Sequence, residues 1–275
     1  MQLEHGFRVV DVNVRLTPER HPAVRDRGRP VTPERLEREM HQAGIVRAVV
    51  SPDPQPETSY VQANNGVARL SVERPFVAFA RINGRRTIGD DPRSRLRNAV
   101  SRREGYHTEP GDIEQYAYDD RFHGFTLDPG VDGLPDEAVL EELESVGLPV
   151  VVAGGTDAPP SALAESVLDR AFPVIVGHFG GHPLQRSLMD EMIDMLDTYD
   201  DCYVDTSLVR YRDQLERALR EHPDRVLFGS GTPVSHPNVA VMEILTLDVS
   251  ADRLARAFSK NAARVVEALD TPSSR

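Results

Sequence analysis

The stretch that decides the fold is GLPVVVAGGTDAPPSALAESVLDRAFPVIVGHFGG, residues 147–181. It contains two apolar runs, LPVVVA from Leu148 and PVIVGH from Pro173, and a segment with helical spacing, residues 161–170, lies between them. Short runs that are continuously apolar, rather than alternating, are typical of strands buried on both faces of a parallel sheet. The stretch therefore predicts a strand, a helix and a second strand.

The same alternation extends over the whole chain. Helical spacing predicts further helices over residues 32–44, 135–147, 183–196, 212–221 and 238–269, the last with a break near Ser250. Thr32 and Pro33 begin the first of these as N-cap and first helical residue. Six more apolar runs bring the total to eight: RVVDVNV from Arg8, VRAVVS from Val46, FVAFARI from Phe76, FHGFTL from Phe122, CYVDTS from Cys202 and RVLFGS from Arg225.

Eight strand–helix units in 275 residues predict the α/β class and a single (β/α)8 TIM-type barrel over residues 1–275. A doubly wound sheet is the alternative. Two polar stretches rich in Arg, Asp, Gly and Pro, residues 18–30 and 83–119, are predicted to lie over a barrel end as loops.

The charge balance disfavours two classes of partner. The chain has 44 Asp and Glu against 32 Lys and Arg, a formal net charge of −12, and no long basic run. Such a surface lacks the cations that bind nucleic acid, and an anionic membrane repels it. No window reaches the roughly 20 apolar residues of a membrane helix, and the N-terminus lacks a signal-peptide pattern, so the sequence predicts a cytoplasmic protein. Cys202, the only cysteine, is predicted to be a buried strand thiol.

The basic residues are almost all arginine. Lys260 is the only lysine, so the other 31 basic residues are arginine. Carboxylates hold water at high ionic strength, where screening weakens the self-repulsion of an acidic surface, and arginine pairs well with carboxylates. We therefore predict a halophilic protein from a cytosol of high salt; the alternative is the preference of a GC-rich genome for arginine.

Polar residues that end the predicted strands are the candidates for chemistry, because the active sites of β/α barrels lie at the carboxyl ends of their strands. Those that matter most for the argument are Asp11, Asn13, Arg15, Arg81, Thr126, Asp128, His178, Asp205 and Ser207.

Motifs in a fixed order carry a family resemblance. They are VVDVNVRL at Val9, TPERLEREMHQAGIVRAVVSP at Thr32, NNGVARL at Asn64, GFTLDP at Gly124, GLPVVVAGG at Gly147, VIVGHFGG at Val174, YVDTS at Tyr203, RVLFGSGTP at Arg225 and FSKNAARV at Phe258. In this order they resemble the amidohydrolase-related proteins, the family 2 branch of the metal-dependent hydrolase superfamily, which includes decarboxylases of aromatic and related acids. The resemblance implies a barrel fold and a hydrolase or decarboxylase activity.

The metal site of that family is not carried by this sequence. A catalytic divalent ion needs about three protein ligands, so the sequence predicts no bound metal and no other cofactor. A relocated site using His178, His236, Asp128 or Asp205 is the alternative. Of the family's ligand positions only His178 remains in register: the D-x-H-x-H signature reads Asp11, Val12, Asn13, Val14, Arg15, the histidine after the fifth strand is replaced by Ala153, Gly154, Gly155, and the aspartate of G-S-D-x-P is Gly231.

Four residues are predicted to bind substrate. Arg15 and Arg81 suit a carboxylate or phosphate held bidentately, although either could instead pair with a loop acid such as Asp53 or Asp128. Thr126 and Asp128 follow the fourth strand, where members of the family often place a polar group that contacts substrate. Asp128 precedes Pro129 and Gly130, so a turn-forming role is its alternative.

Two residues are predicted to act in catalysis. His178 is placed to act as general base or to polarise a carbonyl, and its alternative is a core histidine bonded to backbone. Asn13 is predicted to stabilise developing negative charge. Asp11 should face the same way as Asn13 and orient Asn13 or Arg15 rather than do chemistry, whereas His182 is predicted to cap the next helix or to lie on the surface.

Two functions follow from these residues. The first is an amidohydrolase-related hydrolase or C–C lyase that acts, without metal, on a small anionic carboxylate, lactone or ester substrate. The second is a catalytically inactive barrel retained as a ligand-binding or regulatory module, because a barrel core is independent of the site at its mouth. A homo-oligomer is possible in either case.

Overall fold

The structure, a computed structural model, describes residues 2–16, 31–55, 57–89, 96, 98–99 and 101–270. The loop predicted over residues 18–30 lies outside these ranges. Among the described residues no helix combines the length and the apolar character that crossing a bilayer requires.

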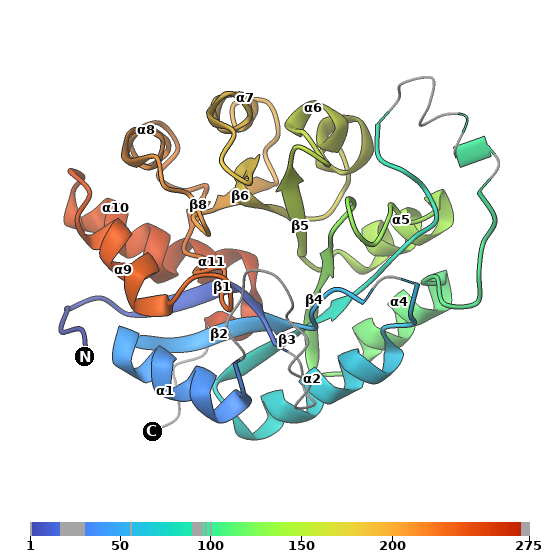
Figure 1. Cartoon of the computed structure of the whole chain (residues 1–275), viewed down its shortest axis with the longest axis horizontal. Coiled ribbons are helices and arrows are strands. Elements are labelled where there is room, and N and C mark those ends of the chain that lie inside the picture. The colour runs from blue at the N-terminus through green and yellow to red at the C-terminus, as the bar shows by residue number, and fades with distance from the viewer. Residues whose placement is uncertain are drawn as a thin grey trace.

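Eight parallel strands form a nearly closed barrel in chain order, and helices lie around their outside (Figure 1). Backbone hydrogen bonds join the first strand to the segment that follows the last one, from Val12 N to Phe228 O at 2.9 Å and from Arg15 N to Thr232 O at 2.8 Å. The predicted (β/α)8 barrel is confirmed. The strands are β1 (Val9–Arg15), β2 (Ile45–Ser51), β3 (Phe76–Arg81), β4 (Phe122–Leu127), β5 (Val150–Gly155), β6 (Val174–His182), β7 (Cys202–Asp205) and β8 (Val226–Leu227).

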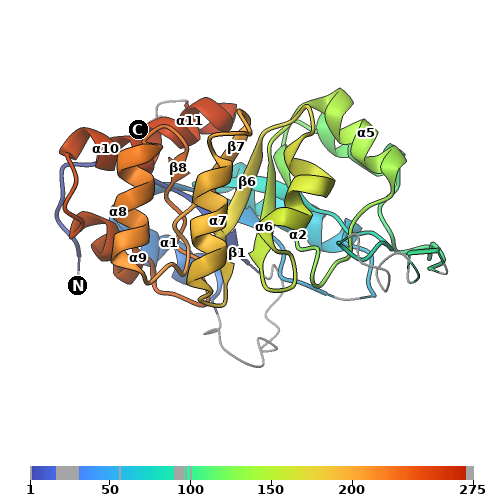
Figure 2. The same ribbon diagram turned by 90° about the horizontal axis from the view of Figure 1, so that it is seen from above.

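The helices follow the strands with local start and stop signals. The Thr32 hydroxyl accepts a hydrogen bond from Arg35 N at the start of the first helix, and Gly44 ends it with a φ of 73°. Two helices, α7 and α8, run side by side along the barrel (Figure 2). The α-helices are α1 (Pro33–Ala43), α2 (Val61–Glu73), α4 (Pro110–Tyr118), α5 (Glu137–Val146), α6 (Pro160–Leu163), α7 (Arg186–Met195), α8 (Arg212–Glu221), α9 (Pro237–Leu245), α10 (Ala251–Ala255) and α11 (Asn261–Val265).

Shorter helical turns extend three of these helices. A π-helical turn, Ala164–Leu168, continues α6, and a second one, Arg256–Lys260, joins α10 to α11. A 3-10 turn, Glu267–Leu269, follows α11. The helix predicted over residues 238–269 is thus divided into several pieces, and the break predicted near Ser250 falls between α9 and α10, where the Ser250 side chain caps α10.

Two helices differ from the sequence-based expectation. The stretch 83–119, predicted to be irregular, contains α4, which begins with a capping box between Glu109 and Asp112 around Pro110. Helix α2 was not predicted, because Asn64, Asn65 and Gly66 have low helix propensity. Its position is fixed by tertiary contacts: the buried Asn64 amide bonds the backbone N and O of Arg81 at 2.8 and 3.0 Å.

The core has two layers, which explains the continuously apolar strands. One layer lies between the strands and the surrounding helices. The other fills the barrel interior, where Val10, Val77, Phe79 and Ile175 pack in one cluster with residues of the C-terminal segment such as Leu269. The amino-terminal end of the barrel is therefore packed, and the carboxyl end is left for a site.

Candidate active site

A cavity of about 310 Å³ opens at the carboxyl ends of the strands. It brings together four of the predicted site residues, Asn13, Arg15, Asp128 and His178. Arg81 and Thr126 are not among the residues that line it. The other lining residues are small or apolar for the most part: Pro54, Gly130, Val131, Ala153, Gly154, Gly155, Thr156, Asp157, Ala158, His182, Leu208, Gly231, Pro233 and Val234.

The backbone turns sharply where β6 delivers His178 to the cavity. His178, Phe179 and Gly180 have φ values of 60°, 49° and 64°. The left-handed region costs a residue with a Cβ roughly 1–2 kcal/mol, so surrounding contacts must hold His178 and Phe179 there. One of these contacts is the hydrogen bond from His178 N to Asp205 Oδ1, 3.3 Å long.

Asp205, at the end of β7, is the centre of a buried hydrogen-bond cluster. Its Oδ2 accepts from Asn13 Nδ2 at 2.8 Å. Its Oδ1 accepts from His178 N, from Ser207 N at 2.8 Å and from the Ser207 hydroxyl. Asn13 Nδ2 also donates to Ser207 Oγ at 3.2 Å, so the donors of the Asn13 amide are engaged within this cluster.

The cluster fixes the tautomer of His178. Its Nδ1 lies 3.0 Å from the carbonyl oxygen of Ser207 and 2.7 Å from Ser207 Oγ. A carbonyl oxygen can only accept, so Nδ1 carries the hydrogen and Nε2 carries the lone pair. Burial lowers the pKa of His178 and the Arg15 charge adds to this, while Asp205 opposes them. His178 is therefore a neutral imidazole whose Nε2 can accept a proton.

Asp11 is hydrogen-bonded to the backbone of Asn13, a member of this cluster. Its Oδ1 accepts from Asn13 N at 3.1 Å and from Ser230 N at 2.9 Å, which ties β1 to the loop after β8. Burial raises the pKa of Asp11 to about 7, and the nearby Asp205 contributes in the same direction. Asp11 thus orients the backbone of Asn13, which is the positioning role expected from the sequence.

The Arg15 guanidinium lies at the cavity and forms a long ion pair with Asp128, one of the loop acids given as its alternative partners. The Arg15 side chain is 27% exposed, its nearest carboxylate oxygen is Asp128 Oδ2 at 3.7 Å, and within the described ranges the guanidinium makes no hydrogen bond. Burial and the charge of Arg81 lower the pKa of Arg15, while Asp128 opposes them. A cation with unused donors in a cavity is suited to an anionic ligand.

Arg81 has a different environment. Its buried guanidinium lies 2.7 Å from Asp132 Oδ2 and 3.8 Å from Asp128 Oδ2, and 5.5 Å from the centre of the Tyr60 ring. The Tyr60 hydroxyl donates to Asp132 Oδ1 at 2.5 Å, and burial raises the pKa of Tyr60 to about 12. These contacts join β3 to the loops before α2 and α5.

Asp128 forms the turn considered for it and also lies at the cavity. Its backbone oxygen accepts from Val131 N and Asp132 N, as a turn residue does, while its side chain lines the cavity. Thr126 is half-buried within β4, where its carbonyl accepts from Ile82 N.

The described residues do not fit the divalent ion that the family resemblance implies. Among them, no group of three or more His, Cys, Asp and Glu side chains could hold a metal ion. At the family's ligand positions the Asn13 amide is turned toward Asp205, and Arg15 places a positive charge. His236 instead caps α9, where its Nδ1 accepts from Asn238 N.

Sequence reasoning missed parts of this site. The sequence places Ser207 and Ser230 at strand ends but assigns neither a role, because single serines at strand ends are common. His182, expected as a helix cap or a surface residue, is exposed, but it ends β6 and also lines the cavity, with its ring centre 5.0 Å from that of His178. The helix begins only at Arg186, since the chain continues as strand through Gly180 and Gly181.

The nearly closed ring of parallel strands, with a cavity at their carboxyl ends, defines a (β/α)8 barrel. A family model described as Amidohydrolase matches residues 10–267, and the chain belongs to this family. No curated protein sequence matches it.

Solved structures share the fold at low identity. A 2,6-dihydroxybenzoate decarboxylase from Rhizobium is 14% identical, with a TM-score of 0.66 over 96% of this chain and 100% of that one. An uncharacterised TIM-barrel protein from Bordetella bronchiseptica is 19% identical, with a TM-score of 0.68 over 96% and 100%. A probable 2-pyrone-4,6-dicarboxylic acid hydrolase from Acinetobacter baumannii, with citric acid bound, is 13% identical, with a TM-score of 0.61 over 94% and 99%.

Proposed function

We propose that this protein is a hydrolase or C–C lyase of the amidohydrolase family that acts on a small carboxylate, lactone or ester without a bound metal. The observation that carries the proposal is the opening of Arg15 and His178 into one cavity. The names of two structural neighbours, a decarboxylase of a hydroxybenzoate and a probable hydrolase of a dicarboxylic acid, support carboxylates as the substrate class.

Hydrolysis uses these two residues in distinct roles. The Arg15 guanidinium binds the substrate carboxylate and, being a fixed cation, also stabilises negative charge on the carbonyl oxygen. His178 Nε2 takes a proton from water as the water oxygen attacks the carbonyl carbon, and the imidazolium returns the proton to the leaving oxygen. Lactones and esters are suitable because their carbonyls are already electrophilic.

We assign Asn13 a positioning role and not that of a hydrogen-bond donor to the oxyanion. Its amide hydrogens point to Asp205 and Ser207, so Asn13 holds these side chains, and through them His178, in place. Arg81 and Thr126 do not line the cavity, so contact with substrate is assigned to Arg15 and Asp128.

Turnover of lactones, esters and carboxylic acids by the purified protein, together with elemental analysis, tests the proposal. We expect activity with less than one transition metal per chain. His178→Ala should lower kcat by about two to four orders of magnitude, the usual contribution of general base catalysis. Arg15→Gln should raise KM and lower kcat, because Arg15 binds the carboxylate and also stabilises the charge on the carbonyl oxygen. His222→Ala is the control, because His222 does not line the cavity.

An unchanged rate in His178→Ala would exclude this mechanism, and one tightly held metal per chain would exclude metal independence. Ligand binding without turnover of any substrate in the series would favour the alternative of a non-catalytic binding module.

A further inference from the structure

Asn13 and His178 form what we call the floor of the cavity. Asp205 determines which of their atoms face a ligand. Both of its carboxylate oxygens accept hydrogen bonds from the cluster, and Asn13 Nδ2 is turned to Asp205 Oδ2 at 2.8 Å. Asp205 and Ser207 are themselves buried and do not line the cavity. The amino group of Asn13 therefore points away from the ligand.

Two acceptor atoms remain for the ligand. The amide oxygen of Asn13 has no hydrogen-bond partner in the part of the chain that the structure describes, and it is not among the enclosed unpartnered atoms. His178 Nε2 likewise has no hydrogen-bond partner among the described residues and is not an enclosed atom. It is an acceptor, because Nδ1 carries the ring hydrogen and donates it to Ser207 O. The floor thus offers acceptors, while Arg15 offers donors and positive charge at the cavity wall.

We propose that the cavity selects small hydroxycarboxylic acids, with the hydroxyl group donating to Asn13 Oδ1 or His178 Nε2 and the carboxylate bound by Arg15. This ligand class rests on the proposed function, and it is the class of compound that hydrolysis of a lactone produces. A volume of about 310 Å³ suits a ligand of this size. An ether or a keto group at the hydroxyl position would place an acceptor oxygen beside Asn13 Oδ1 and His178 Nε2, which are acceptors too, so no hydrogen bond would form.

Binding of matched ligand pairs tests the selection. Glycolate, lactate and mandelate are compared with their O-methyl ethers by ligand-observed NMR titration of the full chain. We expect each hydroxy acid to bind about two- to twelvefold more tightly than its ether, the effect of one net hydrogen bond of about 0.5–1.5 kcal/mol.

Asp205→Asn should exchange the acceptor that Asn13 presents to the ligand for a donor. Three donors keep the new amide oxygen at the Oδ1 position, so its amino group faces the amino group of Asn13. Rotation of the Asn13 amide relieves this clash and turns its amino group to the ligand. We expect the preference for the hydroxy acid to weaken, because His178 Nε2 is then the one acceptor of the pair that remains, whereas Asp190→Asn, at a half-buried ion-pair partner of Arg217, should keep the preference.

The tautomer of His178 is a second readout that needs no ligand. The 15N shifts of labelled histidine should show Nδ1 protonated in the wild type, and the opposite tautomer would overturn the proposal. If Asp205→Asn does not fold, Asn13→Ala should reduce the preference instead. Equal binding of acids and ethers that still depends on Arg15 would refute this inference alone; binding of neither, or binding independent of Arg15, would refute the proposed function as well.

Discussion

Asp11 is a single residue whose environment opposes its charge. It is fully buried, Oδ2 has no hydrogen-bond partner in the described residues, and burial raises its pKa to about 7 from the usual 3.8. Between these two values the folded protein binds a proton that the unfolded chain has released. The contribution of Asp11 to stability is therefore complete below pH 3.8 and is lost as the pH rises through 7.

Asp11→Asn removes this titration and preserves the oxygen that accepts from Asn13 N and Ser230 N. We expect the free energy of unfolding of the wild type to fall, relative to the variant, from about pH 4 to pH 7 and to run parallel above that. Urea denaturation at constant salt across this range measures the difference. Parallel curves throughout would show that Asp11 is ionised at all these pH values.

At the scale of elements, the buried group of Arg81, Asp132 and Tyr60 joins β3 to the loops before α2 and α5. Tyr60→Phe keeps the ring beside Arg81 but removes the hydroxyl that donates to Asp132 and accepts from Gln55 N. A buried acceptor that loses its donor costs about 1–3 kcal/mol, so the free energy of unfolding should fall by that amount. Tyr118→Phe is the matched control, because Tyr118 is 81% exposed; equal stability of the two variants in urea would contradict the assignment.

The order of strands and helices could be predicted because apolar runs and caps are local signals. Thr32 and Gly44 mark the ends of α1 in the sequence as in the structure. The Asp205 cluster could not be predicted, since Asn13 and Asp205 are 192 positions apart and only the closed barrel brings them together. The sequence indicated which residues end the strands; the direction of each hydrogen bond depends on packing between strands.

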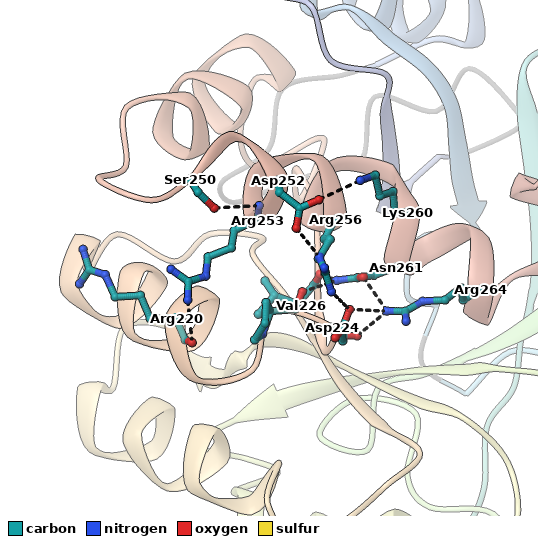
Figure 3. A network of polar contacts seen from close by, with 11 residues as sticks. Arg220, Asp224, Val226, Ser250, Asp252, Arg253, Arg256, Lys260, Asn261 and Arg264 are labelled. Carbon is teal, nitrogen blue, oxygen red and sulfur yellow. Dashed lines mark hydrogen bonds and ion pairs between the residues drawn. The ribbon is translucent and has the colours of Figure 1, made fainter.

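At the scale of the whole molecule, ion pairs and net charge act in opposite directions as salt changes. Figure 3 shows one surface network, in which Asp224 accepts from Arg256 at 2.7 Å and from Arg264 at 3.1 Å. In the same network Asp252 accepts from Arg256 at 2.7 Å and from Lys260 at 3.0 Å. Salt weakens such exposed pairs, each worth about 0–1 kcal/mol, and it also weakens the mutual repulsion of the acid excess.

The repulsion should dominate, because the net charge is −12 and exposed pairs contribute little individually. We predict that the free energy of unfolding in urea rises from dilute buffer to molar KCl. Glu141→Gln with Glu165→Gln removes two exposed charges from positions outside the ion pairs described, so this variant should gain stability in dilute buffer and show a smaller salt effect. Stability that falls with salt would mean that pairs such as those of Arg256 outweigh the repulsion, and the arginine excess would then be a source of stability in ordinary rather than high salt.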